Sequence, residues 1–260
     1  MFSLGINSSF TFGLSALARN QADVASSLEK LSTGKRINRA GDDPSGMIAA
    51  ENHKAEIYTL NKRLDAFAQQ EGYLGAKEGG LSVISERLIE LNGLIVQAAN
   101  EAGTTDQERE ALNVEIGSIL GGIDQIARTT TFKGDTVLAE YTTANLEDDL
   151  SNLTEILAKD PSRAQEVAQD AVDSVARTRG ALGARLNEIE SEKSALGEQL
   201  INLTGSLSGI EDTDYAAEAA KLIRAQIKEQ ASIAAIDIGR QSARQVLGLL
   251  ASATKFNETA

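Results

Sequence analysis

The sequence predicts a mainly α-helical fold: a long antiparallel coiled-coil bundle in which the N- and C-terminal helices pair, with one small β-hairpin. Three observations predict it. Apolar residues recur every three or four positions over long stretches, which is typical of packed helices. The 260 residues are 42% hydrophobic but only 4% aromatic, with no Trp and two Pro, so bulky core residues are scarce. Cysteine is absent, which excludes disulfides and thiolate metal sites and leaves stability to packing alone.

The N-terminal segment predicts an irregular start followed by a helix. Its opening letters, MFSLGINSSFTFG, are polar and contain glycine, so we expect an irregular or late-ordering end. A heptad seam then begins and predicts a helix of roughly 20 residues, about 30 Å long. We expect this seam to be an assembly interface; it consists of Leu14, Leu17, Val24, Leu28 and Leu31.

A break between two helices follows at TGKRINRAGDDPSG. Asp accepts hydrogen bonds from free N–H groups at a helix start, and Pro tolerates the first helical position. Asp43 and Pro44 therefore predict the start of the second helix, and with Asp42 they are expected to form a hinge. We expect its counterpart in the break at residues 210–214, with Asp212 and Asp214 as hinge residues.

Between these breaks the pattern predicts long helices. The heptad phase slips at Gly79-Gly80, but without a Pro one long helix is favoured over two helices with a soft joint. Residues 100–105 break the pattern, and Thr105 with Glu108 forms a capping box that opens a helix expected to fold back antiparallel.

The hairpin and the second half of the chain follow. The letters TTTFKGDTVLA predict a short hairpin near residues 129–139, because Lys133-Gly134 lies between strand-forming residues. Residues 145–158 predict one small amphipathic helix, ended by Asp160-Pro161.

Sustained heptads predict a long helix through Val175 to Ile210, and a last helix from about Tyr215 to Leu250. The expected assembly residues of this last helix are Leu222, Ile233, Ile236, Leu247 and Leu250.

Charge is distributed unevenly along the chain. The net charge is −13, whereas residues 1–40 and residues 221–260 each carry +3, so the middle carries −19. An acidic body argues against nucleic acid as a partner, since a concentrated basic face is expected for it. No apolar run approaches the ~20 residues of a membrane helix, so we expect no membrane insertion. No secretory signal pattern stands at the front, so we expect any export to proceed without a cleaved signal peptide.

The two ends of the chain mirror one another. Each contributes an amphipathic, mildly basic helix joined by a break to an acidic helical body. A two-helix hairpin with polar interruptions is marginal in water, so such ends gain stability mainly by packing against copies of themselves. We therefore expect a self-assembling subunit with two domains, residues 1–40 with 221–260 and residues 41–220.

Motifs along nearly the whole chain resemble those of bacterial flagellins. The block LEKLSTGKRINRAGDDPSGMIAA is similar to the family's N-terminal signature, and GLIVQAANEAGTTDQER to the segment after it. TTTFKGDTVL resembles the family's hairpin. GIEDTDYAAEAAKLIRAQIKEQAS and RQSARQVLGLL resemble its C-terminal hinge and helix. The motifs stand in the family's order, which makes the combined resemblance specific.

The resemblance implies a structural role. In flagellins the terminal helices form the inner tube of a hollow, extracellular flagellar filament, and the body forms an outer tube. It implies a homopolymer exported unfolded by the flagellar type III apparatus, a chaperone on the C-terminal helix, and cap and hook-associated partner proteins. The variable outer domains of larger flagellins have no counterpart between Leu138 and Val175, so the resemblance is to a short form.

The resemblance also implies a possible contact with an innate immune receptor. Leu94, Gln97 and Glu115 match positions that vertebrate Toll-like flagellin receptors contact. Glu90 stands where immune-active members of the family have a basic residue.

Two other functions are compatible with the sequence: a hook-filament junction protein, which resembles flagellin at both ends, and a coiled-coil effector or adaptor that does not polymerise. We expect no enzyme activity and no cofactor. We also expect no metal site, since His53, the only histidine, lacks Cys partners and lies in a predicted helix.

Overall fold

The computed structural model describes residues 3–99, 105–146 and 150–258. The chain divides into two compact units, residues 1–57 with 201–260 and residues 58–200. The long helices α2 (Pro44–Ala98) and α6 (Pro161–Glu211) contribute residues to both units. Almost all of the described backbone is helical, as the sequence predicts, and no described helix is long and apolar enough to cross a membrane.

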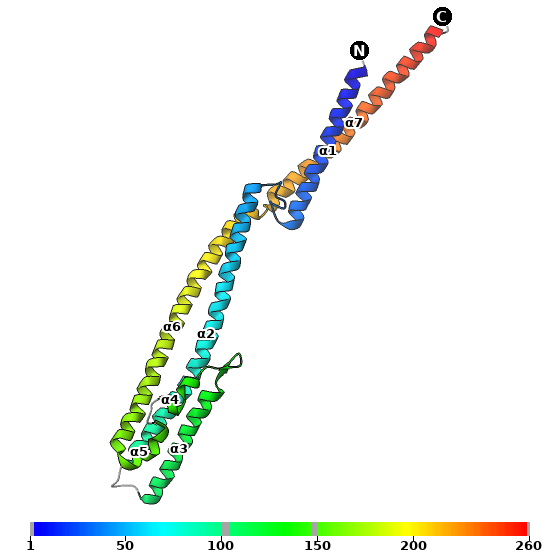
Figure 1. The fold of residues 1–260 in the computed structure, drawn as a ribbon. Coiled ribbons are helices and arrows are strands. Elements are labelled where there is room, and N and C mark those ends of the chain that lie inside the picture. The colour runs from blue at the N-terminus through cyan, green and yellow to red at the C-terminus, as the bar shows by residue number, and fades with distance from the viewer. Residues whose placement is uncertain (1–2, 100–104, 147–149, 259–260) are drawn as a thin grey trace. The chain divides into compact units, whose positions relative to one another are not determined.

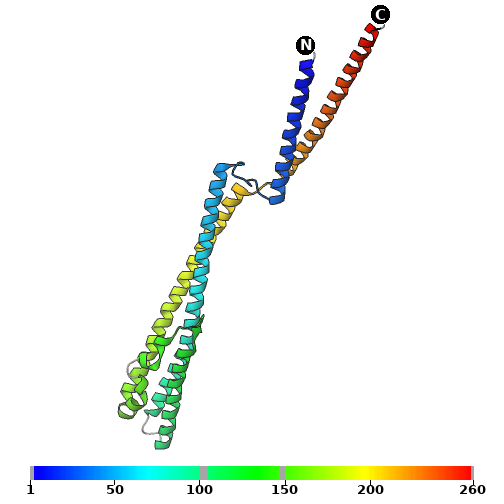
Figure 2. The ribbon, with the colours of Figure 1, turned by 45° about the vertical axis from the view of Figure 1, so that its right-hand side comes forward.

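The first unit contains the paired end helices, α1 (Ser3–Thr33) and α7 (Tyr215–Glu258), which run antiparallel side by side (Figures 1 and 2). The predicted irregular start is wrong, because α1 is helical from Ser3. Contacts with α7 explain the difference: Gly13 packs closely against Ile236, and Arg240 lies over the Phe10 ring. Such packing offsets the helix cost of glycine, about 1 kcal/mol per residue. The last helix also continues beyond the predicted end at Leu250, to Glu258.

The second unit is built on α2, α3 (Asp106–Thr129) and α6. α2 passes through Gly79-Gly80 as one helix, which confirms the prediction. The capping box that opens α3 is also confirmed: the Glu108 N–H donates to Thr105 Oγ1 at 3.3 Å, and the Thr105 N–H donates to Glu108 Oε2 at 2.8 Å. α3 then returns antiparallel along α2 (Figure 1), so the apolar faces of the two helices meet.

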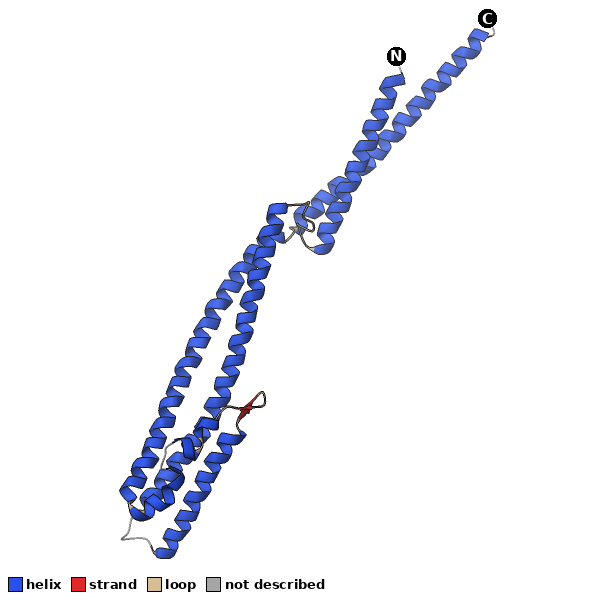
Figure 3. Cartoon of the chain, in the orientation of Figure 1, coloured by secondary structure: helices blue, strands red, loops and turns tan. Residues whose placement is uncertain are grey.

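A small hairpin follows α3 (Figure 3) and confirms the predicted one. Strands β1 (Thr131–Phe132) and β2 (Asp135–Thr136) pair antiparallel around Lys133 and Gly134. Both turn residues have positive φ, 53° and 96°, which a tight hairpin turn requires. Phe132 packs edge-on against Tyr73 of α2, with ring centroids 6.1 Å apart, so the hairpin is anchored to that helix.

The single helix predicted for residues 145–158 is wrong. Its described residues instead fall in three short elements, α4 (Thr143–Leu146), η2 (Leu150–Asn152) and α5 (Leu153–Lys159), and η1 (Ala139–Tyr141) precedes them. Asp124 of α3 fixes the first part, since its Oδ1 accepts from the N–H and the hydroxyl of Thr143 at 2.7 and 3.0 Å. Leu150, Leu153 and Leu157 then reach the core. Tertiary contacts therefore override the local periodicity.

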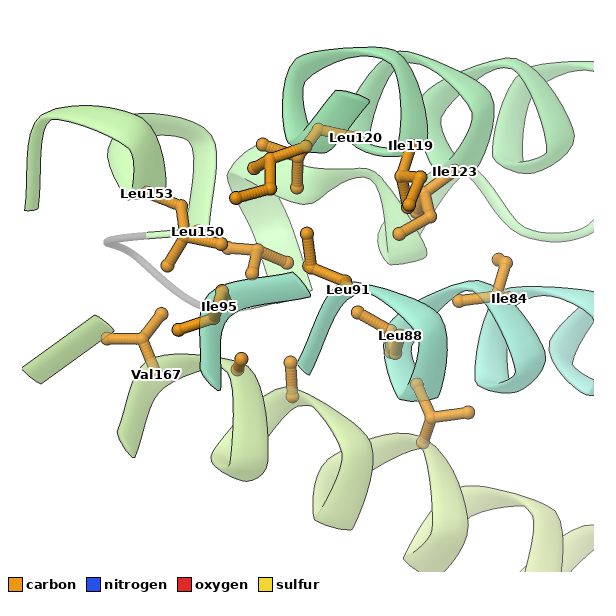
Figure 4. Close-up of a cluster of buried hydrophobic side chains, with 14 of the residues drawn as sticks. Ile84, Leu88, Leu91, Ile95, Ile119, Leu120, Ile123, Leu150, Leu153 and Val167 are labelled. Atoms are coloured by element: carbon orange, nitrogen blue, oxygen red, sulfur yellow. The ribbon is translucent and has the colours of Figure 1, made fainter. Parts of the chain in front are cut away.

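The core of the second unit lies where α2, α3, the short helices and α6 converge (Figure 4). Leu88, Leu91 and Ile95 of α2 are fully buried. They face α3 on one side and Val167 of α6 on another, and the short helices add Leu150 and Leu153. α6 begins at Pro161, where Asp160 accepts a hydrogen bond from the Arg163 N–H, as expected of an N-cap before proline.

Candidate assembly surface and paired linkers

The two segments that connect the end helices to α2 and α6 pair with one another. Lys35 and Asp212 form an antiparallel backbone bridge. The Arg36 N–H donates to the Glu211 carbonyl at 2.6 Å, and the Thr213 N–H donates to the Gly34 carbonyl at 2.9 Å. We call residues 34–43 and 212–214 the paired linkers. Backbone hydrogen bonds donated from each side hold the two segments in register. The paired linkers therefore form one structure rather than two independent hinges.

Caps fix where the helices stop at the paired linkers. Gly34 ends α1 with φ of +72°, the left-handed conformation that glycine adopts without strain. Asp43 Oδ1 accepts from the Gly46 N–H at 2.9 Å and starts α2 at Pro44. Asp214 Oδ1 accepts from the N–H groups of Ala216 and Ala217 and starts α7.

The remaining expected hinge residues also stabilise the paired linkers. Asp42 Oδ2 accepts from the N–H groups of Asn38 and Arg39, each at 3.0 Å. These backbone hydrogen bonds lower the pKa of Asp42, and the hydrogen bond from the Gly46 N–H lowers that of Asp43. Asp212 takes part in the backbone bridge and accepts from the Ser208 hydroxyl.

Glu211 is a buried charge that the sequence analysis missed. Its side chain is nearly covered and lies 2.6 Å from Lys35 Nζ and 3.1 Å from Lys54 Nζ. Burial alone would raise the pKa of Glu211, but hydrogen bonds from Lys35 and Lys54 outweigh it and hold the pKa below its ordinary value. Glu211 thereby ties α6 to the first linker and to α2. Its position at the end of the heptad run, directly before the break, was the available signal.

The predicted assembly residues on α1 and α7 fall into two groups. One group is half-buried within the helix pair: Leu17, Val24, Leu31, Leu222 and Ile236. The other is about half exposed or more: Leu14, Leu28, Ile233 and Leu247. The Leu250 side chain lies outside the described residues. The first group contributes to pairing within one chain, and the second leaves apolar surface uncovered.

A second apolar stripe on α7 was missed because the sequence analysis followed one seam. Ile223, Ile227 and Ile238 are 56%, 60% and 65% exposed. Spacings of four and eleven residues place them on one side of the helix. Val246 and Leu249 add further exposed apolar groups toward the C-terminus. The exposed apolar stripe, by which we mean Ile223, Ile227 and Ile238, faces away from α1.

Polar contacts set the register of the end helices. The Ser27 hydroxyl donates to Glu218 Oε1 at 2.7 Å, and Glu218 also accepts from Lys221 Nζ at 2.9 Å. Farther along, Asn20 Nδ2 donates to the Ser232 hydroxyl at 2.8 Å. Among the side chains that the structure describes, few are buried between α1 and α7, so these polar pairs specify the alignment more than a packed core does.

Comparison with known proteins identifies the family. Residues 9–143 match the bacterial flagellin N-terminal helical region, and residues 165–250 match the bacterial flagellin C-terminal helical region. The chain belongs to the bacterial flagellin family. The two matches cover most of each end helix, the paired linkers and most of the body.

Relatives match the flagellin chain over nearly its whole length. A flagellin from Halalkalibacterium halodurans is 31% identical, over 89% of this chain and 92% of that protein. The flagellar filament 30.7 kDa core protein of Treponema maltophilum is 28% identical, over 94% of this chain and 98% of that protein. A Bacillus subtilis flagellin is 26% identical, over 91% of this chain and 96% of that protein.

The predicted receptor-contact residues of this flagellin lie on the body. Gln97 on α2 and Glu115 on α3 are exposed, whereas Leu94 is half-buried against the core. Glu90 is engaged locally, because Arg87 Nη1 lies 2.7 Å from its Oε2. The charge at this position is therefore partly neutralised by a neighbour one turn earlier.

No metal-binding cluster exists among the residues for which side chains are described. The His53 ring instead lies beside the Ser206 hydroxyl, with Nε2 and Oγ 3.3 Å apart. This contact between α2 and α6 gives the histidine a local role in helix packing.

Proposed function

We propose that this flagellin is the structural subunit of an extracellular flagellar filament, in which the end helices pack against those of neighbouring copies. One observation carries the proposal: the helix pair leaves apolar side chains exposed on α7, namely the exposed apolar stripe together with Ile233 and Leu247. Fully burying one such side chain contributes about 1.5–3 kcal/mol. The relatives named as flagellins and as a filament core protein support the same function.

Assembly through the ends fits the uneven distribution of buried surface. The body has a continuous core of fully buried side chains, whereas the described part of the α1–α7 pair has few buried side chains. A helix pair without a core is marginally stable in water. Copies that cover each other's apolar surface would supply the missing burial, so the ends become fully ordered when they assemble. The inner-tube domain of residues 1–40 with 221–260, and the outer-tube domain of residues 41–220, are part of this proposal.

The same exposed surface on α7 is proposed to bind an export chaperone before assembly. An apolar helix face of this size invites aggregation while the subunit is inside the cell. A chaperone that covers it would keep the subunit monomeric until type III export. Contacts with the filament cap and with hook-associated proteins are proposed for the same end helices.

Polymerisation of purified protein tests the proposed function. Monomer is brought to increasing ammonium sulfate concentration, which strengthens apolar burial, and is imaged by electron microscopy. Long filaments of uniform diameter are expected. Monomer that persists under all conditions would contradict the proposal and favour a non-polymerising coiled-coil protein. Deleting the gene and measuring motility then tests whether the subunit is a major or a minor component of the filament.

Leu94, Gln97 and Glu115 are proposed contacts for a Toll-like flagellin receptor. The exposure of Gln97 and Glu115 supports access from outside the monomer. Glu90 presents the opposite charge to that of immune-active family members, so we expect weak activation. Replacing Glu90 by Arg should raise activation in a receptor reporter assay, and no change would remove Glu90 from the contact.

A further inference from the structure

A charged groove lies between α1 and α7, close to the paired linkers. Its volume is about 320 Å³. Four cationic side chains line it against two carboxylates: Lys30, Lys221, Arg224 and Lys228 against Asp23 and Glu218. We call this the cationic groove. All of its residues belong to the first compact unit.

The groove keeps free positive charge after its internal pairs are made. Glu218 is buried and already accepts from Ser27 and Lys221, so its charge is neutralised within the chain. In the part of the chain that the structure describes, Lys30, Arg224 and Lys228 form no ion pair. The Nε–H of Arg224 donates to the Ala220 carbonyl at 3.1 Å. These three cations face one remaining carboxylate of the lining, Asp23, so the groove keeps a net positive charge and an incoming carboxylate would be stabilised there.

Asp237 is the matching carboxylate on the same helix. It is exposed and, among the described residues, it has no ion-pair partner. It lies nine positions after Lys228, which at 3.6 residues per turn places the two side chains on opposite sides of α7. Asp237 therefore cannot reach the groove of its own chain. A second copy packed against α7 can present it.

We infer that the cationic groove of one copy binds the Asp237 carboxylate of a second copy. The inference rests on the proposed function and names one contact within it. The groove and the carboxylate lie on opposite faces of the helix, so the contact is heterologous. Each copy binds the Asp237 of one neighbour in its groove and places its own Asp237 in the groove of another neighbour. A heterologous contact that does not close into a ring builds an open helical polymer. A two-fold contact would instead stop at a dimer.

The neighbouring apolar residues fit the same contact. Ile223 and Ile227 stand next to Arg224 and Lys228 in the sequence, and Ile238 stands next to Asp237. The exposed apolar stripe therefore runs between the cationic side of α7 and the Asp237 side. A copy that inserts Asp237 into the groove would also cover the edge of the stripe, so the charge pair sets the position and apolar burial adds affinity.

Charge exchange tests the contact. Lys228→Glu and Asp237→Lys are each made in the full chain, and the concentration of monomer left at equilibrium with filaments is measured in low salt after seeding with filament fragments. Each variant is expected to raise this concentration about tenfold or more, equivalent to about 1.4 kcal/mol. The double variant Lys228→Glu/Asp237→Lys should return it to within about threefold of the wild type, because the pair is restored with its signs exchanged. An equimolar mixture of the two single variants should also assemble.

The controls separate the possible failures. Arg177→Glu reverses an exposed charge on α6 and should leave assembly in the wild-type range. High salt should narrow the difference between wild type and single variants, because it screens exposed pairs. Charge-reversed single variants that assemble as well as the wild type would overturn the groove contact alone. Single variants that fail without rescue in the double variant would overturn Asp237 as the partner. Wild-type protein that never assembles would overturn the proposed function and this contact together.

Discussion

The backbone of Lys35 lies opposite Asp212 in an antiparallel bridge, joining two segments from opposite ends of the chain. The connections to the end helices are therefore cross-linked by hydrogen bonds just where each helix ends. Movement of one connection must be accompanied by movement of the other.

Removing the buried charge of Glu211 should loosen the paired linkers. Glu211→Gln weakens the hydrogen bonds to Lys35 and Lys54 and leaves the two cations close together. Breaking a buried pair costs about 3–5 kcal/mol, but both lysines are partly exposed, so we expect about 1–2 kcal/mol. Hydrogen exchange of the Arg36 amide, which donates to the Glu211 carbonyl, measures the local opening. The control Glu51→Gln removes only an exposed partner of Lys54 and should change protection little.

The paired linkers should also weaken in acid. The folded-state pKa of Glu211 is below its ordinary value of 4.5, so its stabilising contribution is fully present above that pH and is lost as the pH falls through the folded pKa. Asp42 and Asp43, with pKa values below 3.8, act in the same direction at lower pH. Protection factors of the linker amides, corrected for intrinsic exchange, should fall below pH 4.5. The Glu211→Gln variant should show a smaller fall. Equal pH dependence in both proteins would remove Glu211 from the effect.

Gly80 should not tolerate a side chain. A Cβ there would collide with Leu138 and lie 3.0 Å from Thr130, both in the chain that leaves α3. Gly80→Ala is expected to destabilise the body by about 1–3 kcal/mol through overpacking. Its neighbour Gly79 has open space, so Gly79→Ala should be neutral or stabilise by up to about 1 kcal/mol. Thermal unfolding of both variants provides the comparison, and equal effects would contradict the predicted close approach.

The exposed apolar stripe should be required for assembly but not for folding. Ile227→Asp removes apolar surface and adds a charge, so it should raise the monomer concentration in equilibrium with filaments by at least about tenfold. Gln226→Asp adds the same charge next to it without removing apolar surface, and should have a smaller effect. Circular dichroism should show unchanged helix content in both. Normal assembly of Ile227→Asp would place the subunit contacts elsewhere.

The body should fold without the end helices. A fragment of residues 41–220 keeps the core of the second unit, so we expect it to be soluble, helical and monomeric. Sedimentation and circular dichroism check both properties. Filaments formed by this fragment would show that the ends are not the assembly element.

Heptad periodicity and capping residues predicted most of the long elements. α2, the Thr105–Glu108 capping box and the hairpin at Lys133-Gly134 were all predictable, because each depends on residues close in sequence. The segment at residues 145–158 was not, since it follows contacts with α3 rather than its own period. The same applies to the start of α1, whose glycine pattern suggests an irregular chain until α7 packs beside it.

The expected site was predictable in its parts but not in its arrangement. Asp43 was expected at a helix start from its capping chemistry and Asp214 as a hinge residue of the second break, and the structure places each at a helix start. The pairing of the linkers and the ion pairs of Glu211 depend on partners far away in the sequence, and the place of Glu211 before the break does not identify those partners. The exposed apolar stripe could have been found by testing a second periodic phase on the last helix.

The sequence separation within the paired linkers has a consequence for the order of folding. Lys35 and Glu211 are 176 positions apart, and Gly34 cannot engage Thr213 until that residue has been delivered. If the chain becomes free to fold from one end, the linker that is free first therefore has no partner until almost the whole subunit is free to fold. Closure then brings the two end helices, α1 and α7, together in one late step. A chain truncated before Glu211 cannot form the paired linkers. The amides of its residues 34–43 should therefore exchange rapidly.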